Sequence, residues 1–518
     1  MRTDQHFDVI IIGTGAGGGT LARALSTTGK RVLILERGEY LPREKENWDA
    51  ATVIGKGHYK AHETWLDKDG REFHPSIHYW VGGNTKVYGS ALIRFRKQDF
   101  GEVRHYGGSS LAWPISYDDM EPYYTAAERM YRVHGLRGSD PTEPPSSAPF
   151  PHPAVSHEPA MQELVDGMKA IGHRPFPMPL GINLNEADHE ASQCMRCNTC
   201  DGFPCLVDGK SDAHVVGVRP ALQSPNVTLL TGALVQRLIS NASGSKIERV
   251  LVERAGKSEQ YSAEIVVVAA GAVNSAALFL RSESDRHPQG LANGSGMVGR
   301  NYMAHQNSGM VCLSSKLNLT VFQKTMGLND FYFGADDSEL PLGHISMLGK
   351  LDGNALKAGA PGFVPLGLLN CMARHSFDFW LTSEDLADPE NRVTLEKDGQ
   401  VRLSYTPNNV EAHTRLVDKL KGMVGRLLPL GLKLDKRMPI EATAHQCGTL
   451  RMGADAASSV VNRDCRAHEV DNLFVADASV FPSSAAVNPG LTIMANALRV
   501  ADRIGAVLGT PVNASAIA

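Results

Sequence analysis

The chain has no apolar run that approaches the roughly 18 residues needed for a membrane-spanning helix. Its first residues, Met-Arg-Thr-Asp-Gln-His, also lack a basic segment followed by an apolar stretch and a small-residue cleavage site. The sequence therefore shows no signal peptide and no membrane span, and we expect a cytoplasmic, soluble protein.

Cysteine and net charge are scarce as well. Eight cysteines in 518 residues fall short of the density of a disulfide scaffold, and a net charge of −4 gives no reason to expect nucleic acid or an anionic membrane as a partner. Glycine is abundant by contrast, since 50 residues exceed the usual share of roughly 7%. Such an excess fits tight turns and close backbone approaches to a ligand. The length predicts two domains.

The first motif is a glycine-rich loop between a strand and a helix. Residues 7–12 form a β-branched apolar run that is typical of a strand buried on both faces, and Gly-Thr-Gly-Ala-Gly-Gly follows at 13–18. Residues 20–26 fit a helix, and a second strand spans 31–35. This strand–loop–helix–strand order indicates that G-x-G-x-x-G is a dinucleotide-binding loop.

Each residue type in this unit has a physical role in nucleotide binding. Gly13 permits the tight turn, Gly15 lets a pyrophosphate approach the backbone, and Gly18 lets the helix pack on the strand. Glu36 ends the second strand and can accept hydrogen bonds from the ribose hydroxyls; Arg37 follows it on the same side of the predicted site. NAD and FAD both use such a loop, so the loop alone leaves the cofactor open.

Two later segments predict further strands of the same sheet. Residues 265–271, Ile-Val-Val-Val-Ala-Ala-Gly, have the composition of a buried parallel strand and mark where a discontinuous nucleotide domain resumes. Residues 471–477 form another such strand, and its last residue, Asp477, could bond a ribityl chain.

Five motifs, in this order along nearly the whole chain, resemble the glucose–methanol–choline (GMC) oxidoreductases, which bind FAD. They are the unit 13–36, Val-Gly-Gly-Asn-Thr-Lys-Val-Tyr-Gly at 81–89, Val-Gly-Arg-Asn-Tyr-Met at 298–303, Pro-Glu-Asn-Arg-Val at 389–393, and the pair His445 and Asn488. The resemblance implies an α/β fold: a Rossmann-type FAD-binding domain with an interleaved α+β substrate domain, a mixed sheet backed by helices.

The resemblance also implies positions for the cofactor. The loop at 81–89 would line the isoalloxazine through Gly82, Gly83, Asn84 and Thr85, and Val235 would meet the adenine. Some family members tether the flavin through a histidine in this loop, where the present chain has Val87. Valine has no nucleophile, so we expect non-covalent FAD.

His445 and Asn488 fit the chemistry of alcohol oxidation. The flavin carries the redox chemistry, and the protein positions the substrate and handles the proton. A histidine with a pKa near neutrality can accept the hydroxyl proton, and asparagine can hold the same oxygen. Pro489 and Thr492 belong to the segment that begins a helix predicted over 491–501, whose N-terminus could stabilise negative charge on reduced flavin. The other histidines, including His305, have no such support in the sequence.

Within the family, residues 111–119 and 121–124 look most like pyranose 2-oxidases and bacterial glycoside 3-oxidases. The expected activity is FAD-dependent oxidation of a secondary hydroxyl of a sugar or glycoside, at C2 or C3, with hydride to flavin N5 and the proton to His445. The expected partners are that substrate and oxygen or another electron acceptor. A hydroxynitrile-lyase-like enzyme that keeps FAD only as structure stays an alternative.

A cysteine cluster supports a further alternative. Cys194, Cys197 and Cys200 match the C-x2-C-x2-C spacing of ferredoxins, but Cys205 comes after four intervening residues and follows a proline instead of preceding it. Iron–sulfur ligation would make the chain a sugar dehydrogenase subunit that relays electrons to a partner; a zinc site is a weaker possibility. We expect no metal and a structural role.

The domain division follows from the order of the motifs. The FAD-binding domain is expected to comprise residues 1–95, 225–305 and 440–518, and the substrate-binding domain residues 96–224 and 306–439. Residues 138–159 hold seven prolines and predict an exposed arm or a lid without regular structure. Residues 315–342 predict a substrate-entry loop, with an ordinary surface excursion as the alternative.

Overall fold

The computed structural model describes residues 5–428, 431–442 and 445–512. Its helices, in chain order, are α1 (Ala16–Leu25), α2 (Tyr117–Met130), α3 (Pro159–Ala170), α4 (Arg219–Ala221), α5 (Ala272–Arg281), α6 (Gly353–Gly359), α7 (Leu366–His375), α8 (Val410–Leu427) and α9 (Gly490–Val507).

The larger sheet carries the predicted Rossmann-type part. Its strand order is β10-β2-β1-β13-β12-β11, and β21 pairs with β13 beside β1. The strands are β1 (Gln5–Ile12), β2 (Val32–Leu35), β10 (Val227–Leu230), β11 (Ala233–Ser240), β12 (Ile247–Arg254), β13 (Lys257–Val268) and β21 (Leu473–Val475). β10, β2, β1, β13 and β21 run parallel, and their apolar side chains are buried, as the β-branched runs predicted.

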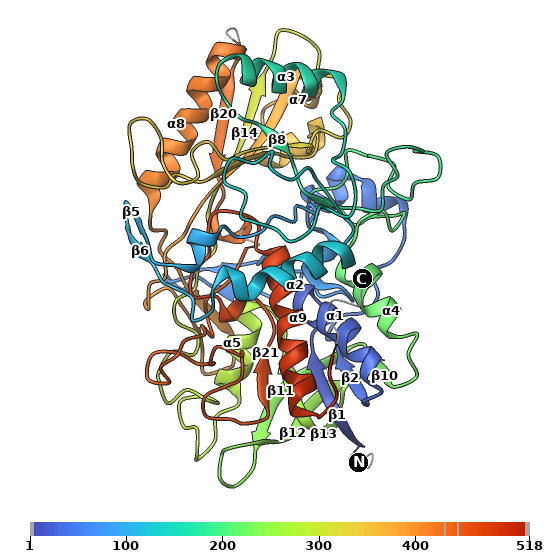
Figure 1. The fold of residues 1–518 in the computed structure, drawn as a ribbon, viewed down its shortest axis with the longest axis vertical. Helices are drawn as coiled ribbons and strands as arrows, with labels where there is room; N and C mark the ends of the chain where they lie inside the picture. The colour runs from blue at the N-terminus through green and yellow to red at the C-terminus, as the bar shows by residue number, and fades with distance from the viewer. Residues whose placement is uncertain (1–4, 429–430, 443–444, 513–518) are drawn as a thin grey trace.

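The first and the last helices of the chain pack together in this part of the molecule. α9 packs against α1 and α2, and Figure 1 shows the red C-terminal elements β21 and α9 beside the blue β1 and α1. The last part of the chain therefore returns to the first strand–helix unit, which places C-terminal side chains near the glycine-rich loop.

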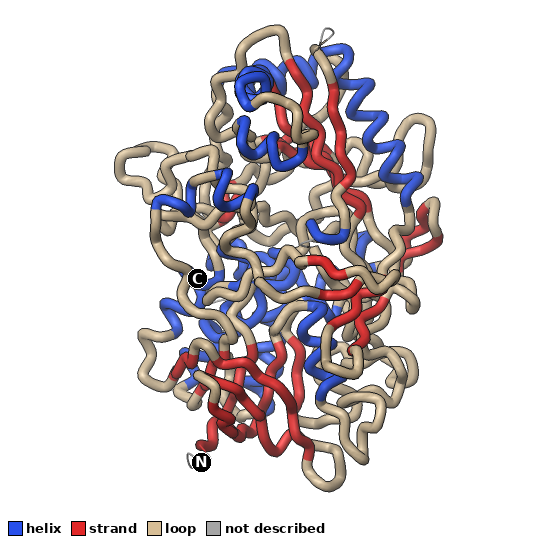
Figure 2. The backbone as a smooth tube through the Cα atoms, turned by 180° about the vertical axis from the view of Figure 1, so that it is seen from behind, coloured by secondary structure: helices blue, strands red, loops and turns tan. Residues whose placement is uncertain are grey.

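A second sheet forms the other half of the fold, and Figure 2 shows its strands well apart from those of the first. Its order is β20-β14-β17-β16-β15-β8. The strands are β8 (Phe176–Pro177), β14 (Gln306–Leu313), β15 (Met326–Leu328), β16 (His344–Met347), β17 (Ser376–Ser383) and β20 (Lys433–Arg437). α8 packs on β14 and β17, and α3 packs on α8, so helices back this sheet as predicted.

One detail of the predicted second sheet is wrong. A mixed sheet was expected, but every pairing between its described strands is antiparallel. Strand direction depends on how the connections return the chain, and the long, irregular connections here carry no periodic pattern that shows it. The strands of this sheet fall at 176–177 and 306–437, and the division of the chain into two interleaved domains stays a prediction.

Smaller sheets lie between these two parts. One has the order β18-β19-β3-β4, and two short hairpins are β5–β6 and β7–β9. Their strands are β3 (Trp65–Leu66), β4 (Glu72–Phe73), β5 (Val103–His105), β6 (Gly108–Ser110), β7 (Val133–His134), β9 (Leu180–Gly181), β18 (Arg392–Leu395) and β19 (Val401–Ser404).

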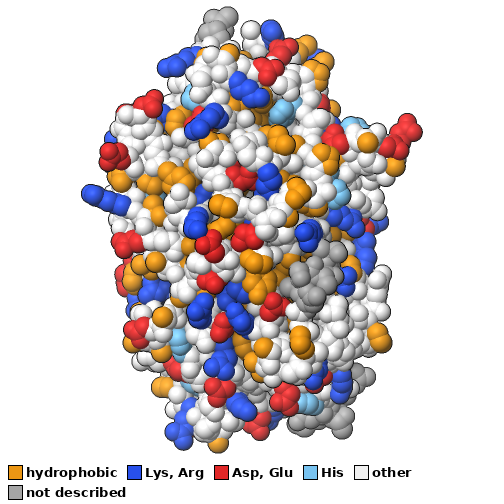
Figure 3. Space-filling view, in the orientation of Figure 1, with side chains coloured by type: hydrophobic (Ala, Val, Ile, Leu, Met, Phe, Trp, Pro, Cys, Tyr) orange, Lys and Arg blue, Asp and Glu red, His pale blue; other side chains and the backbone are white. Residues whose placement is uncertain are grey.

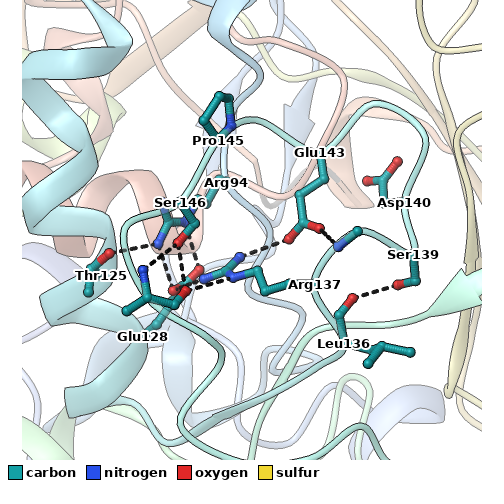
Figure 4. A network of polar contacts seen from close by, with 12 residues as sticks. Arg94, Thr125, Glu128, Leu136, Arg137, Ser139, Asp140, Glu143, Pro145 and Ser146 are labelled. Carbon is teal, nitrogen blue, oxygen red and sulfur yellow. Dashed lines mark hydrogen bonds and ion pairs between the residues drawn. The ribbon is translucent and has the colours of Figure 1, made fainter.

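Buried charges fix the proline-rich segment to α2 (Figure 4). Glu128 of α2 accepts hydrogen bonds from Nε and an amino group of Arg94, both at 2.8 Å, and also pairs with Arg137. Arg137 donates to Glu143 at 2.8 Å. The segment 138–158 contains no helix or strand, and this network holds its first part in place.

No helix in the part of the chain that the structure describes combines the length and apolarity that a bilayer crossing requires. On the face shown in Figure 3, acidic and basic side chains alternate without a patch of one sign.

Candidate active site

The glycine-rich loop has the steric features that its sequence predicts. Gly13 has φ +100°, and a Cβ there would lie 2.4 Å from the carbonyl oxygen of Ala269. A Cβ at Gly18 would lie 2.0 Å from the carbonyl oxygen of Gly13, so only glycine lets α1 pack this closely on the loop. Gly15, just before α1, faces open space instead. That space lies at the helix N-terminus, where unpaired N–H groups favour a phosphate.

Glu36 is held beside this loop by three hydrogen bonds. Its Oε2 accepts from the backbone N–H of Thr14 at 3.0 Å and from the Thr14 hydroxyl at 2.5 Å, and its Oε1 accepts from the N–H of Gly38 at 2.9 Å. Burial raises the pKa of Glu36, and these hydrogen bonds oppose the rise. The carboxylate is thus fixed at the carboxyl end of β2, where a ribose contact is expected.

The second glycine loop packs directly on the first. The N–H of Gly82 donates to the hydroxyl of Thr14 at 2.9 Å, and a Cβ at Gly83 would lie 3.1 Å from Cα of Gly15. Both glycines have positive φ, at +104° and +55°. Thr14, which the sequence did not single out, therefore joins the two loops and Glu36.

The remaining residues of this loop face the protein. Asn84 accepts a hydrogen bond from the N–H of His78 at 2.9 Å through its side chain. The hydroxyl of Thr85 donates to the carbonyl of Gly82 at 2.5 Å and accepts from the N–H of Ala213 at 2.9 Å. Both side chains therefore set the loop conformation, and their contact with an isoalloxazine stays a prediction.

Val235 on β11 and Arg37 in the turn after β2 lie near Glu36. The N–H of Ala233 donates to the carbonyl of Glu36 at 2.8 Å, and Val235 follows two residues later on β11. Arg37 stacks over the ring of Tyr79, with 3.6 Å from Cζ to the ring centroid. The structure thus brings Val235, Arg37 and Glu36 to one end of the site, which suits the adenosine half of a dinucleotide.

The carboxylate of Asp477 accepts hydrogen bonds from both neighbouring elements. One carboxylate oxygen accepts from the N–H of Gly271 at 2.9 Å and the hydroxyl of Ser275 at 2.6 Å, and the other accepts from the N–H of Ser479 at 2.9 Å. Burial raises the pKa of Asp477. Asp477 ties the end of β21 to the start of α5, and a ribityl contact stays a prediction.

A short path connects the glycine loop to the C-terminal histidine. A Cβ at Gly17 would lie 1.5 Å from the carbonyl oxygen of Ala476, so α1 touches the end of β21. The N–H of Gly448 then donates to the carbonyl of Ala478 at 3.1 Å. His445 precedes Gly448 by three residues, so the histidine segment and the loop share one wall.

His445 lies in a row of hydrogen-bonding groups. Its Nε2 is 3.4 Å from the side-chain nitrogen of Asn488, and its Nδ1 is 3.0 Å from Nδ1 of His305. Nε2 of His305 is 3.0 Å from the carbonyl oxygen of Ser484. The predicted His–Asn pair is therefore assembled, and His305 completes the row.

The carbonyl at the end of the row fixes the tautomers. A carbonyl oxygen only accepts, so His305 carries its hydrogen on Nε2 and accepts through Nδ1. His445 must then donate through Nδ1, which leaves the lone pair of Nε2 facing Asn488. Burial, together with the neighbouring His305, lowers the pKa of His445 to about 3, and burial lowers that of His305. The lowered pKa keeps His445 neutral near pH 7, with the lone pair of Nε2 available to a proton.

The motif at 298–303 is joined to the segment of His445 by a pair of backbone hydrogen bonds. The N–H of Met303 donates to the carbonyl of Cys447 at 3.0 Å, and the N–H of Cys447 donates back at 2.9 Å. Each histidine lies two residues from this bridge. A Cβ at Gly448 would lie 2.1 Å from the carbonyl oxygen of Asn301, so glycine is needed here for a close backbone contact.

The segment 389–393 supports the bridge from the other side. The N–H of Tyr302 donates to the carbonyl of Asn391 and the N–H of Val393 donates to the carbonyl of Gly299, both at 2.8 Å. These contacts explain why two motifs far apart in sequence accompany the histidine pair. His305 itself was missed because its only signal is its place two residues after the 298–303 motif.

Pro489 and Thr492 lie at the start of α9. Pro489 is the residue before the first turn, and α9 extends to Val507, well beyond the predicted end at 501. The buried hydroxyl of Thr492 is 2.8 Å from the hydroxyl of Tyr124 on α2. Asn488 is thus held between the row of histidines and a helix whose N-terminus points into the site.

FAD fits these residues on steric and chemical grounds. The open space at Gly15 lies at a helix N-terminus, Glu36 offers fixed acceptors, and the second glycine loop packs against the first. The residues that would hold it are Gly13, Gly15, Gly18, Glu36, Gly82 and Gly83, with Asn488 and Pro489 at the far end.

The four clustered cysteines are free thiols in the structure. Burial raises the pKa of Cys194 to about 12 and that of Cys200 in the same direction, with the neighbouring thiols adding to both shifts. Among the described residues, no three His, Cys, Asp or Glu side chains are grouped so as to hold a metal ion. The structural role of the cluster stays a prediction.

Comparison with known proteins gives a consistent result. Two family models described as GMC oxidoreductase match residues 7–307 and 390–497. The chain is 31% identical to 6'''-hydroxyparomomycin C oxidase of Streptomyces lividus and 30% identical to paromamine 6'-oxidase of Streptomyces fradiae, in each case over 97% of this chain and 92% of the relative. The crystal structure of pyridoxine 4-oxidase from Mesorbium loti superposes with a TM-score of 0.68 at 19% identity, over 96% of this chain and 99% of that one.

Proposed function

The chain belongs to the GMC oxidoreductase family, an FAD-dependent family acting on CH–OH groups, and from that premise we propose that it oxidises a hydroxyl of a sugar or glycoside. The observation that carries the proposal is the row Asn488–His445–His305–Ser484, because it leaves one basic lone pair, on Nε2 of His445, beside an amide that can hold the same oxygen.

The proton of the substrate hydroxyl goes to His445. Asn488 now lies at 3.4 Å, a long contact for a hydrogen bond, so a hydroxyl can take its place at Nε2 and accept from the amide in turn. FAD, when bound, accepts the hydride from the carbinol carbon, which becomes a carbonyl. The protonated His445 would keep donating through Nδ1 to His305, which spreads part of the new charge toward the Ser484 carbonyl.

Two positions on the sugar compete, and each rests on its own observation. The segments 111–119 and 121–124 favour a secondary hydroxyl at C2 or C3, through their resemblance to pyranose and glycoside oxidases. The two Streptomyces relatives are named as a 6'''-hydroxyparomomycin C oxidase and a paromamine 6'-oxidase. These names favour position 6 of an amino sugar. The first yields a ketone and the second an aldehyde.

Anaerobic mixing with a panel of sugars, glycosides and aminoglycosides tests the proposal. Bleaching of the flavin absorbance, followed by NMR of the product, identifies the substrate and the carbon oxidised. Failure of every compound to bleach the flavin would contradict the proposal. Release of cyanide from a hydroxynitrile without bleaching would support the lyase alternative, and stoichiometric iron in anaerobically purified protein would support the electron-relay alternative.

A further inference from the structure

A small acidic cleft lies beside the histidine row. The lining residues that matter here are Asp99, His105, Tyr332, Phe333, Glu384 and Ala486. Its free space is on the order of one water molecule, enough for a single small group and too little for a sugar ring. Five of its lining residues come from the segment 332–343, which overlaps the predicted substrate-entry loop.

Glu384 has an unsatisfied acceptor in this cleft. Glu384 is buried, with 6% of the residue's surface exposed, and its Oε2 is 3.1 Å from Nε2 of His105. The amide nitrogen of Asn409 lies 3.5 Å from Nδ1 of His105, so Nδ1 accepts and Nε2 carries the hydrogen. Oε1 of Glu384 and Nε2 of His105 are both buried without a hydrogen-bond partner. Nε2 lies next to the other carboxylate oxygen, Oε2. A buried acceptor without a partner is costly, so Oε1 is open to a donor bound in the cleft.

A second carboxylate faces the same space. Oδ2 of Asp99 accepts from the hydroxyl of Tyr332 at 2.8 Å and from the N–H of Arg96 at 2.6 Å. Burial and the nearby charge of Glu384 raise the pKa of Asp99 to about 7, against the attraction of Arg96. The two carboxylates therefore repel each other across the cleft, and a cation between them would relieve that repulsion.

The guanidinium of Arg96 lies near the cleft and is itself paired with a third carboxylate. Arg96 is fully buried and pairs with Asp140, and it stacks over the ring of Tyr332 with 5.0 Å from Cζ to the centroid. The lining of the cleft itself carries two carboxylates, those of Asp99 and Glu384, and one histidine, His105.

The cleft and the histidine row share their backbone. The N–H of Ala486 donates to the hydroxyl of Tyr332 at 3.2 Å, and Ala486 lies two residues from both Ser484 and Asn488. On the other side, Asp385, next to Glu384, accepts from the N–H of Ala304 at 3.0 Å, next to His305. A substrate with its hydroxyl at His445 would thus have a neighbouring substituent near Glu384.

We infer that this cleft receives the ammonium group of an amino sugar, with Glu384 Oε1 as its principal acceptor and Asp99 as the second carboxylate. The inference rests on the proposed oxidation of a sugar hydroxyl and names its substrate class. Aromatic faces of Tyr332 and Phe333 would cover the adjoining sugar carbons.

Matched pairs of compounds test this in the holoenzyme. Paromamine and 2-amino-2-deoxyglucose are compared with their N-acetyl derivatives, which keep the hydroxyls and lose the charge. In the wild type, N-acetylation should raise the half-saturating concentration for anaerobic flavin bleaching at least about tenfold, the scale of one buried hydrogen bond to a charged group. Glu384→Gln should reduce that preference to less than about threefold. Glu339→Gln is the control, because Glu339 is exposed and lies in the segment 332–343; this variant should keep the preference.

Glutamine has nearly the same size as glutamate, so the variant should preserve the shape of the cleft; retained FAD content and melting temperature check this. Calorimetric titration of the oxidised holoenzyme with paromamine supplies a readout that needs no turnover. Bleaching without preference for the free amine, or an undiminished preference in Glu384→Gln, would overturn the inference and leave the proposed function standing. Glu384-dependent binding of the amine without bleaching by any sugar would overturn the proposed oxidation and support the cleft as an ammonium site.

Discussion

The nucleotide loop and the histidine row differ in how they are built. The loop is one continuous stretch, residues 13–18, and its properties come from glycines that remove a Cβ where the backbone must approach. The row takes His305, His445, Ser484 and Asn488 from three separate segments, and its properties come from partly buried side chains that bond to one another. The glycine loop can be predicted from the sequence, whereas the histidine row forms only when the chain has folded.

This difference predicts different consequences of mutation. Changes in the loop region should affect how tightly FAD is retained, and changes in the row should affect the rate at which substrate reduces it.

The largest effect is expected for His445→Ala. The variant should lose at least about a hundredfold in the rate of flavin reduction, the low end of general-base contributions, and should keep its FAD. Stopped-flow absorbance measures the rate. The matched control is His413→Ala, since His413 is also buried but both its ring nitrogens bond to the hydroxyls of Ser308 and Ser383 in the second sheet. A His445 variant within threefold of wild type would place the base elsewhere.

His305 should contribute about tenfold through the tautomer of His445. Its φ is +62°, which glycine and asparagine tolerate. His305→Gly removes the acceptor and keeps the backbone, so the rate should fall; His305→Asn can place Oδ1 where Nδ1 lies and should recover most of it. Equal rates for the two variants would show that His305 has only a structural role.

Glu36→Ala tests the nucleotide side of the comparison. Loss of the carboxylate should weaken FAD retention by about tenfold without changing the chemistry, because excess FAD restores turnover. Flavin fluorescence after dilution measures retention, and Glu39→Ala, an exposed glutamate three residues later, is the control. Turnover that stays low at full occupancy would contradict a purely binding role. Acid precipitation of the wild type should release the yellow FAD, as expected for a non-covalent cofactor.

The pH profile should separate the row from an ordinary histidine. A folded-state pKa of about 3 keeps His445 neutral above that value, so the rate of flavin reduction should show no loss near pH 6.5 and should fall only as the pH approaches 3. Stopped-flow reduction between pH 4.5 and about 8 measures this. A decrease in the rate centred near pH 6.5 would contradict this prediction, because it would show that His445 has an ordinary histidine pKa when substrate and cofactor are bound.

The smallest effects are expected in the cysteine cluster, outside both regions. Single replacements of Cys194, Cys197, Cys200 and Cys205 by serine should cost about 1 kcal/mol of stability and leave flavin reduction intact. Thermal unfolding and elemental analysis measure the two quantities. Stoichiometric iron or zinc that is lost in the variants would contradict a structural role.

The sequence by itself determined the first half of this comparison. A β-branched strand, the spacing of Gly13, Gly15 and Gly18, and Glu36 after the next strand are local features, and their geometry follows from sterics within a few residues. The family resemblance extended this to His445 and Asn488, and to the order of the motifs along the chain.

Only the tertiary structure decided the rest. The antiparallel direction of the second sheet, the place of His305 in the row and the unpaired oxygen of Glu384 each depend on contacts between segments far apart in the chain. The low pKa of His445 has the same origin, because desolvation comes from all the elements packed around it. Residue types and spacings describe what each segment can do, but burial and hydrogen-bond partners are properties of the assembled fold.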